Sequence, residues 1–215
     1  MNAKNNNLIM RRFTGIMLFS ITIASCGQDI KCNRAVEYDF LIKKIPEEVC
    51  LPEGHQITRL YKSTDVNKDG LKDLIFDWSK INLKDGDTLY VSIYNQLNDS
   101  TFSHFKTFNN LKPIFFKEYS FEYRVKDPML NEIKSKYNEQ IPPYRLEFKN
   151  NIIYISFIIG APYVTINQYY QYKKDTWYLM KEEIWDESGE HIKKEKIMGF
   201  EQLRIDDFDY LNYLD

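Results

Sequence analysis

Two runs of sequence, RLEFKNNIIYISFII at 145–159 and VTINQYYQYKK at 164–174, decide the fold class of this chain. Both are rich in β-branched and aromatic residues, and parts of them alternate apolar with polar side chains. Such runs are typical of β-strands. The KNN at 149–151 and the KKD at 173–175 stand between strand-like runs and predict hairpin turns. This part of the chain is therefore predicted to be antiparallel β-structure.

Further strand-like runs flank this region. They are YDFLIKKI at 38–45, DLIFDW at 73–78, TLYVSIYN at 88–95 and TWYLMKEEIW at 176–185. A helix is predicted for DPMLNEIKSKYNE at 127–139, because Asp127 can cap it and Pro128 suits its first turn. The sequence DDFDYLNYL at 206–214 predicts a second short helix. The expected fold is mainly β, an antiparallel sheet, sandwich or barrel-like domain with one or two short helices, and an α+β fold remains the alternative.

The aromatic residues suggest a binding surface. The chain has 16 tyrosines, 14 phenylalanines and 3 tryptophans, and such side chains can stack on sugars or anchor protein interfaces. Tyr170 and Tyr172 share one face of the predicted strand, with Trp177 across the turn, and these three are the candidate partner-binding aromatics. The competing interpretation is that one aromatic row lies in the core and the other on a half-exposed face.

The N-terminus indicates export. Arg11 and Arg12 precede the uncharged run FTGIMLFSITIA at 13–24, which is shorter than the roughly 20 residues of a membrane-spanning helix. The residues Ile23-Ala24-Ser25-Cys26 resemble the lipobox of bacterial lipoproteins. That resemblance implies a signal peptide over 1–25, lipid on Cys26, and a location in the cell envelope. Gly27 after the cysteine favours the outer membrane on either face. The alternative is an ordinary secretory signal with an incidental cysteine.

After cleavage, residues 26–36 would form a lipidated tether and residues 37–215 a single β-rich domain. Residues 1–25 carry three basic side chains and no acid, so the formal charge falls from −2 to −5. This charge, without a basic stripe, argues against nucleic acid as a partner. With Cys26 lipidated, Cys32 and Cys50 are predicted to form a disulfide, which would close a loop of about 18 residues and stabilise the fold by roughly 3 kcal/mol.

The stretch DVNKDGLKD at 65–73 predicts a calcium site. Calcium takes six to eight oxygen ligands, which loops provide from alternate positions. Gly70 would allow the sharp turn between the two halves of the loop. The predicted ligands are the side chains of Asp65, Asn67, Asp69 and Asp73 and the backbone carbonyl of Leu71.

Phe76 occupies the position where an EF-hand loop needs glutamate, so an ordinary EF-hand is excluded. The segment instead resembles the calcium loop of FG-GAP or VCBS repeats, which is followed directly by a hydrophobic strand. TLYVSIYNQLNDSTF at 88–102 resembles the next strand of such a repeat. One copy does not make a propeller, and small β-rich envelope proteins with one such loop include inhibitors of cell-wall hydrolases. The resemblance therefore implies a calcium-stabilised binding or inhibitor module.

Catalytic signatures are weak. The three histidines are far apart in sequence, and no nucleophile elbow, zinc or phosphate-loop motif occurs. The acidic pairs at 182–183 and 186–187 are interpreted as surface charges, because neighbours on a strand face opposite ways. The sequence thus predicts a non-catalytic protein with an unidentified protein or glycan partner. The alternative is an envelope hydrolase or carbohydrate-active enzyme with an unrecognised site.

Overall fold

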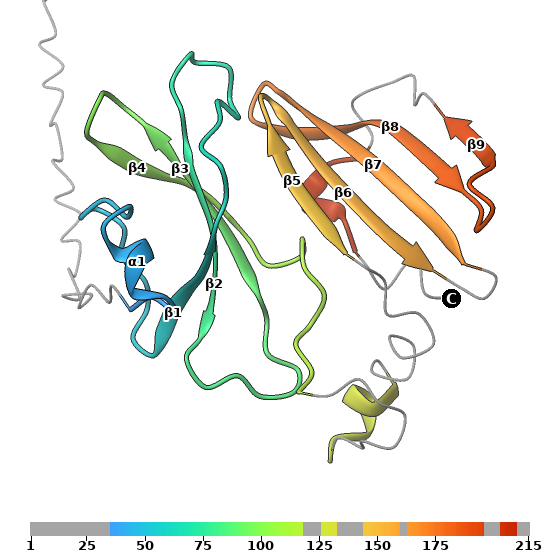
Figure 1. Cartoon of the computed structure of the whole chain (residues 1–215), viewed down its shortest axis with the longest axis horizontal. Coiled ribbons are helices and arrows are strands. Elements are labelled where there is room, and N and C mark those ends of the chain that lie inside the picture. The colour runs from blue at the N-terminus through green and yellow to red at the C-terminus, as the bar shows by residue number, and fades with distance from the viewer. Residues whose placement is uncertain (1–34, 118–125, 133–143, 160–162, 196–202, 210–215) are drawn as a thin grey trace, which may run out of the picture. The chain divides into compact units, whose positions relative to one another are not determined.

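A computed structural model of the chain contains two antiparallel β-sheets (Figure 1). It describes residues 35–117, 126–132, 144–159, 163–195 and 203–209, which all belong to one unit, Lys31–Asp215. The predicted mainly β class, with antiparallel strands and short helices, is confirmed.

The first sheet has four strands in sequential order, joined as a meander. They are β1 (His55–Leu60), β2 (Leu74–Lys80), β3 (Tyr90–Gln96) and β4 (Phe102–Phe108). The central strand β2 is buried on both faces, because each of its residues before Lys80 is buried. β2 and β3 correspond to the runs DLIFDW and TLYVSIYN predicted to be strands.

The second sheet has five strands, again in sequential order. They are β5 (Arg145–Lys149), β6 (Ile152–Ile159), β7 (Val164–Lys173), β8 (Thr176–Trp185) and β9 (His191–Glu195). Both predicted hairpin turns are confirmed, since Lys149 pairs with Ile152 and Lys173 with Thr176 across two-residue loops. Asn150 and Lys174 take the positive φ angles, 51° and 65°, that such tight turns demand.

The prediction of a strand at 38–45 is wrong, because Asp39–Ile42 form the short helix α1. Leu41 and Ile45 are buried while all three residues between them are exposed, and a strand that buried both would also bury Lys43, so the spacing is helical. Residues 128–132 are helical as predicted. The carboxylate of Asp127 accepts the amide of Met129 at 2.9 Å and so caps that helix.

Both helix predictions extend beyond the described residues. The helix predicted for 127–139 extends into 133–143, and the C-terminal helix into 210–215, neither of which is described. Within the described part of the latter, Ile205–Asp207 form the 3₁₀ turn η1 and Phe208 is extended.

The main hydrophobic core joins the two sheets. Ile75 and Ile93 from the first sheet belong to the same buried cluster as Ile153 and Ile166 from the second. Trp177 on β8 is fully buried, and its ring lies 5.8 Å from that of Phe108 and 5.9 Å from that of Phe105, both on β4. Aromatic contacts therefore connect β4 of one sheet to β8 of the other.

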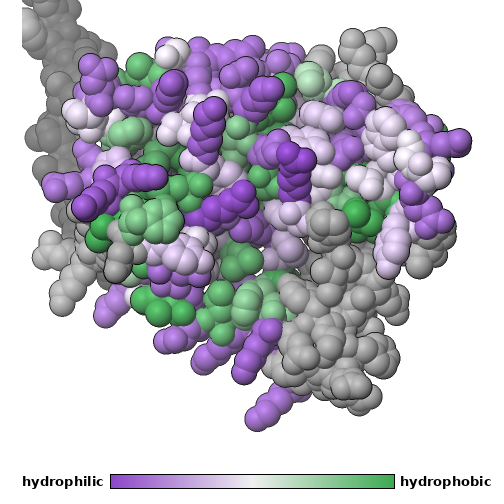
Figure 2. All heavy atoms as spheres, viewed as in Figure 1, coloured by the Kyte–Doolittle hydropathy of each residue, from purple (hydrophilic) through white to green (hydrophobic). Residues whose placement is uncertain are grey.

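A second, smaller core lies on the opposite face of the first sheet. Phe76 and Trp78 of β2 pack there with Leu41 and Ile45 from the α1 segment. Val36, at the end of the predicted tether, forms a parallel bridge with Ile57. In the view of Figure 2, hydrophobic side chains lie in separate patches between hydrophilic ones.

Candidate functional site

The predicted metal loop is a closed turn that leads directly into β2. Thr64 and Asp73 form an antiparallel bridge, and the Asp73 amide donates to the Thr64 carbonyl at 2.9 Å. The Thr64 hydroxyl accepts the Asn150 amide at 2.8 Å, so the loop is also tied to the β5–β6 hairpin. Val66, in the middle of the loop, is fully buried in the main core. The loop is thus anchored at both ends and by one apolar side chain.

The first carboxylate of the loop is held by backbone amides. Asp65 accepts the amide of Lys68 at 2.6 Å through one oxygen and the amide of Gly70 at 3.0 Å through the other. Lys68 and Gly70 have φ angles of 68° and 89°. The positive φ of Gly70 explains why glycine suits this position, because a side chain there would strain the backbone.

The next two polar side chains continue the same pattern. Asn67 accepts the Asp69 amide at 3.0 Å, and the Asp69 carboxylate accepts the Leu71 amide at 2.8 Å. The Asn67 amide group also donates to the second Asp69 oxygen at 2.8 Å. The alternate polar residues predicted to be metal ligands therefore direct their side-chain oxygens toward the backbone amides of one turn.

Asp73 is the loop carboxylate whose pKa is shifted from its usual value. Its side chain is fully buried, and its oxygens accept the amides of Val66 at 2.9 Å and Gln96 at 3.2 Å. Burial raises the pKa of Asp73 to about 6, the two amides oppose that rise, and the charges of Asp69 and Asp65 add to it. The fold therefore holds a carboxylate whose charged form is disfavoured by its surroundings.

Gln96, at the end of β3, is a member of this site that sequence reasoning missed. Besides donating its amide to Asp73, it accepts the Lys72 amide at 3.1 Å through its side-chain oxygen. Gln96 lies 23 residues beyond Asp73 in the chain, and only the β2–β3 pairing brings the two together. Gln96 lies within TLYVSIYNQLNDSTF at 88–102, which resembles the next strand of an FG-GAP repeat, but that resemblance assigned it no role in the site.

The donor set fits calcium by chemistry. Three carboxylates and one amide offer hard oxygen ligands, and each carboxylate oxygen that accepts one amide keeps a second lone pair. In the described part of the chain, however, no three His, Cys, Asp or Glu side chains form a group that could hold a metal ion as they stand. The prediction of calcium binding by Asp65, Asn67, Asp69, Leu71 and Asp73 stays a prediction.

The prediction of exposed partner-binding aromatics at Tyr170 and Trp177 is wrong. Tyr170 is 3% exposed and Trp177 is fully buried, and both belong to the main core. Tyr172 is half-buried and packs against the same core. Alternation along β7 places Tyr169 on the opposite face, so that row faces away from the core.

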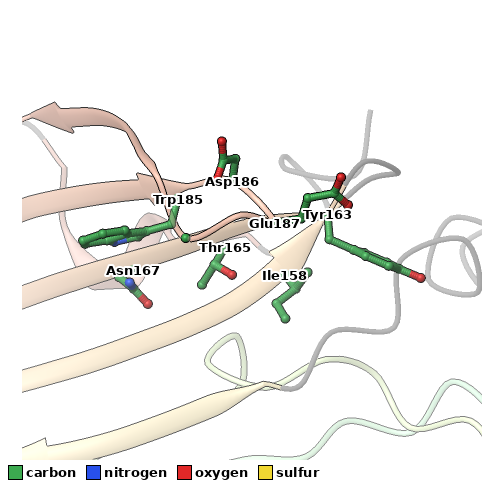
Figure 3. A pocket seen from close by; sticks show the side chains of 8 residues that line it. Ile158, Tyr163, Thr165, Asn167, Trp185, Asp186 and Glu187 are labelled. Carbon is green, nitrogen blue, oxygen red and sulfur yellow. The ribbon is translucent and has the colours of Figure 1, made fainter.

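We call this opposite side of β5–β9 the outer face, and it carries two clefts. The first has a volume of about 630 Å³ and is lined by Tyr163, Thr165, Asn167 and Trp185 among others (Figure 3). Thr165 pairs directly with Trp185 across β7 and β8, so the two stand on one face. The second cleft, about 420 Å³, lies over β5–β7 and is lined by Tyr154 and Tyr169 among others.

Three of the four acids considered for hydrolysis are engaged in structure, and the fourth, Glu187, lines a cleft. Glu182 accepts the Gln168 amide group at 2.7 Å on one side of β8. Glu183, on the other side, pairs with Lys181 and accepts the Tyr169 hydroxyl at 3.1 Å. A hydrogen bond from Ser188 lowers the pKa of Asp186 below its usual value, whereas a general acid needs a raised pKa.

Several predicted features fall outside the described residues. The signal peptide, Cys26 and Cys32 all lie within residues 1–34. Cys50 is disulfide-bonded, and its pairing with Cys32 stays a prediction. In the described ranges, no helix has the length and apolar character needed to cross a membrane.

No protein-family model, no curated protein and no solved structure matches this chain significantly. Function is therefore inferred from the residues and their geometry.

Proposed function

We propose that the chain is a non-catalytic binding module of the bacterial cell envelope, anchored by lipid on Cys26 and stabilised by calcium in loop 65–73. The observation that carries the calcium part is Asp73, a fully buried carboxylate whose pKa is raised by burial and further by the charges of Asp69 and Asp65. A divalent cation would neutralise this cluster and favour its charged form. The resemblance of the loop to FG-GAP repeats supports the same assignment.

Calcium would act on the fold rather than on a substrate. The loop connects β1 to β2 and contacts both the end of β3, through Gln96, and the β5–β6 hairpin, through Asn150. Asp65, Asn67, Asp69 and Asp73 would hold the ion with the Leu71 carbonyl. A cation bound only in the folded state stabilises that state by mass action, and here it would fix the link between the two sheets.

Thermal unfolding of residues 27–215 tests the calcium site. At a calcium concentration of about one hundred times Kd, we expect the free energy of unfolding to rise by about 2.7 kcal/mol. The melting temperature should then rise with calcium, less with magnesium, and fall back with excess chelator. Asp69→Ala should abolish the rise while leaving the chelated protein nearly as stable as before, because its side chain lies in an exposed turn.

Asp99→Ala is the matched control, because Asp99 is an exposed acid in the separate β3–β4 turn. This variant should keep the full calcium response. If calcium leaves the melting temperature of the wild-type protein unchanged, the loop is a polar turn and the calcium part of the proposal is overturned.

The binding role is supported by the outer face of β5–β9. Its two clefts combine half-buried aromatic rings with polar side chains, which is the usual composition of ligand sites. Of the three acids that line these clefts, Glu147 pairs with Arg145 and Asp186 is held by the turn that follows β8, which leaves Glu187. This arrangement favours recognition over hydrolysis.

Lipid anchoring is tested by expressing the full chain in a Gram-negative host with a labelled fatty acid. We expect the wild-type protein to carry the label and to sediment with the membrane fraction. Cys26→Ser should lose the label and become soluble in the periplasm. Cys32→Ser is the control and should remain labelled; equal labelling of the Cys26→Ser variant would contradict the anchor.

A further inference from the structure

The outer face of the second sheet is built as a continuous aromatic and polar surface. Alternate residues of three neighbouring strands form it, among them Tyr154 of β6, Asn167 and Tyr169 of β7, and Trp185 of β8. Tyr154 pairs with Tyr169 across the strands, and their rings lie 5.0 Å apart. The Tyr154 hydroxyl donates to the Asn167 side-chain oxygen at 2.7 Å. This bond joins the two clefts, because Tyr154 lines one and Asn167 the other.

The first cleft contains a buried donor without an acceptor. The indole nitrogen of Trp185 is buried and has no hydrogen-bond partner. Because solvent does not reach this nitrogen, a ligand in the cleft would contact the indole ring of Trp185 rather than its N–H. Figure 3 shows Trp185 on the strand next to that of Thr165 and Asn167, whose side chains project from the same sheet. These polar groups offer complementary donors and acceptors.

One side of the same cleft is an exposed aromatic ring. Tyr163 lines the cleft and is 58% exposed. The C–H face of a pyranose ring is apolar, whereas its edge carries hydroxyls. A pyranose ring can therefore pack flat on a tyrosine ring while the sugar hydroxyls reach polar groups around the tyrosine. The cleft offers both elements, and its volume lies in the range of small-ligand sites, about 300–1,000 Å³.

Two basic side chains of the outer face are paired with acids within the protein. Arg145 pairs with Glu147 beside the second cleft, and Lys181 pairs with Glu183 between the clefts. Lys181 also lies over the Tyr169 ring, 5.0 Å from its centroid. Lys149 also lines the second cleft, but the first cleft is lined by two acids, Asp186 and Glu187, which disfavour a polyanion there. The outer face suits an uncharged ligand that is longer than one cleft.

We propose that the outer face of β5–β9 binds an extended neutral oligosaccharide, with one sugar in the Tyr163–Trp185 cleft and the chain continuing over Tyr154 and Tyr169. This inference rests on the proposed binding function and names its ligand class. The aromatic rings, that of Trp185 included, contact the apolar sugar faces, and Thr165 and Asn167 hydrogen-bond the hydroxyls. No bond is made or broken.

The test is calorimetric titration of residues 27–215 with cellotetraose and with chitotetraose. We expect at least one of these neutral tetrasaccharides to bind. Tyr163→Ala and Trp185→Ala should each weaken its binding about tenfold or more. Tyr38→Ala is the matched control, since Tyr38 is 49% exposed on the distant α1 segment, and it should bind like the wild type.

Three results would overturn the oligosaccharide site. They are no heat from either tetrasaccharide, binding only of a sulfated tetrasaccharide, or wild-type affinity in the folded Tyr163→Ala variant. Tyr163 is exposed, so this variant is expected to fold. Mass spectrometry of the recovered sugar separates this proposal from the proposed function. Shorter fragments would overturn the non-catalytic assignment and leave the site in place, whereas absent binding leaves the calcium response untouched.

Discussion

Replacing Lys112 with methionine is expected to lower the free energy of unfolding by about 3–5 kcal/mol, which is typical when one partner of a buried ion pair is removed. The Lys112 ammonium lies 2.5 Å from the carboxylate of Asp77, whose side chain is 2% exposed on the central strand β2. The same carboxylate oxygen accepts the Tyr61 hydroxyl at 3.1 Å. Methionine keeps the apolar stem of lysine but leaves the Asp77 charge buried without a cation. Urea unfolding followed by tryptophan fluorescence measures the loss.

The control removes both charges. Lys112→Met combined with Asp77→Asn leaves no buried ion, so we expect most of the lost stability to return. Tyr61 supports this picture, because burial and the neighbouring Asp77 charge both raise the pKa of its hydroxyl, which stays protonated and keeps donating. If the single Lys112→Met variant lost less than about 1 kcal/mol, Asp77 would have to be hydrated rather than held by Lys112.

The strands that the sequence predicts well are those that must bury side chains. β2, β3, β6, β7 and β8 are interior strands of their sheets, and all appear as apolar or aromatic runs. The three strands that were not predicted, β1, β4 and β9, are all edge strands, and β5 is the one edge strand that lies within a predicted run. An edge strand needs fewer apolar residues and commonly carries charge, as HIKKE in β9 does. Their positions follow from pairing with neighbours rather than from their own composition.

Which face of the second sheet is buried was harder to predict from the sequence. Alternation along β7 separates Tyr169 from Tyr170, but a pattern with aromatic residues on both faces does not say which one is buried. The pairing register decides it, since Tyr170 lies opposite Ile153, a fully buried residue of β6. In the loop, by contrast, local spacing was sufficient to bring Asp65, Asn67 and Asp69 together. The burial of Asp73 and the contribution of Gln96 required the tertiary fold.

Trp177→Ala is expected to cost about 3–5 kcal/mol of unfolding free energy, as large aromatic truncations in cores do. Trp177 is fully buried, with the Tyr172 ring at 4.9 Å and the Phe105 and Phe108 rings within 6 Å. Its loss would leave a cavity where β4 of the first sheet meets β8 of the second. Urea unfolding, monitored by circular dichroism because a tryptophan is removed, measures the change.

Trp185→Ala is the matched control, because it makes the same substitution on the same strand but on the outer face. We expect it to cost about 1 kcal/mol, since Trp185 is only partly buried and its indole nitrogen has no partner to lose. The two variants therefore separate the faces of β8: one should lose stability and the other saccharide binding. Similar losses of stability from both would mean that the outer face is packed as tightly as the core. The clefts would then not be available to a ligand.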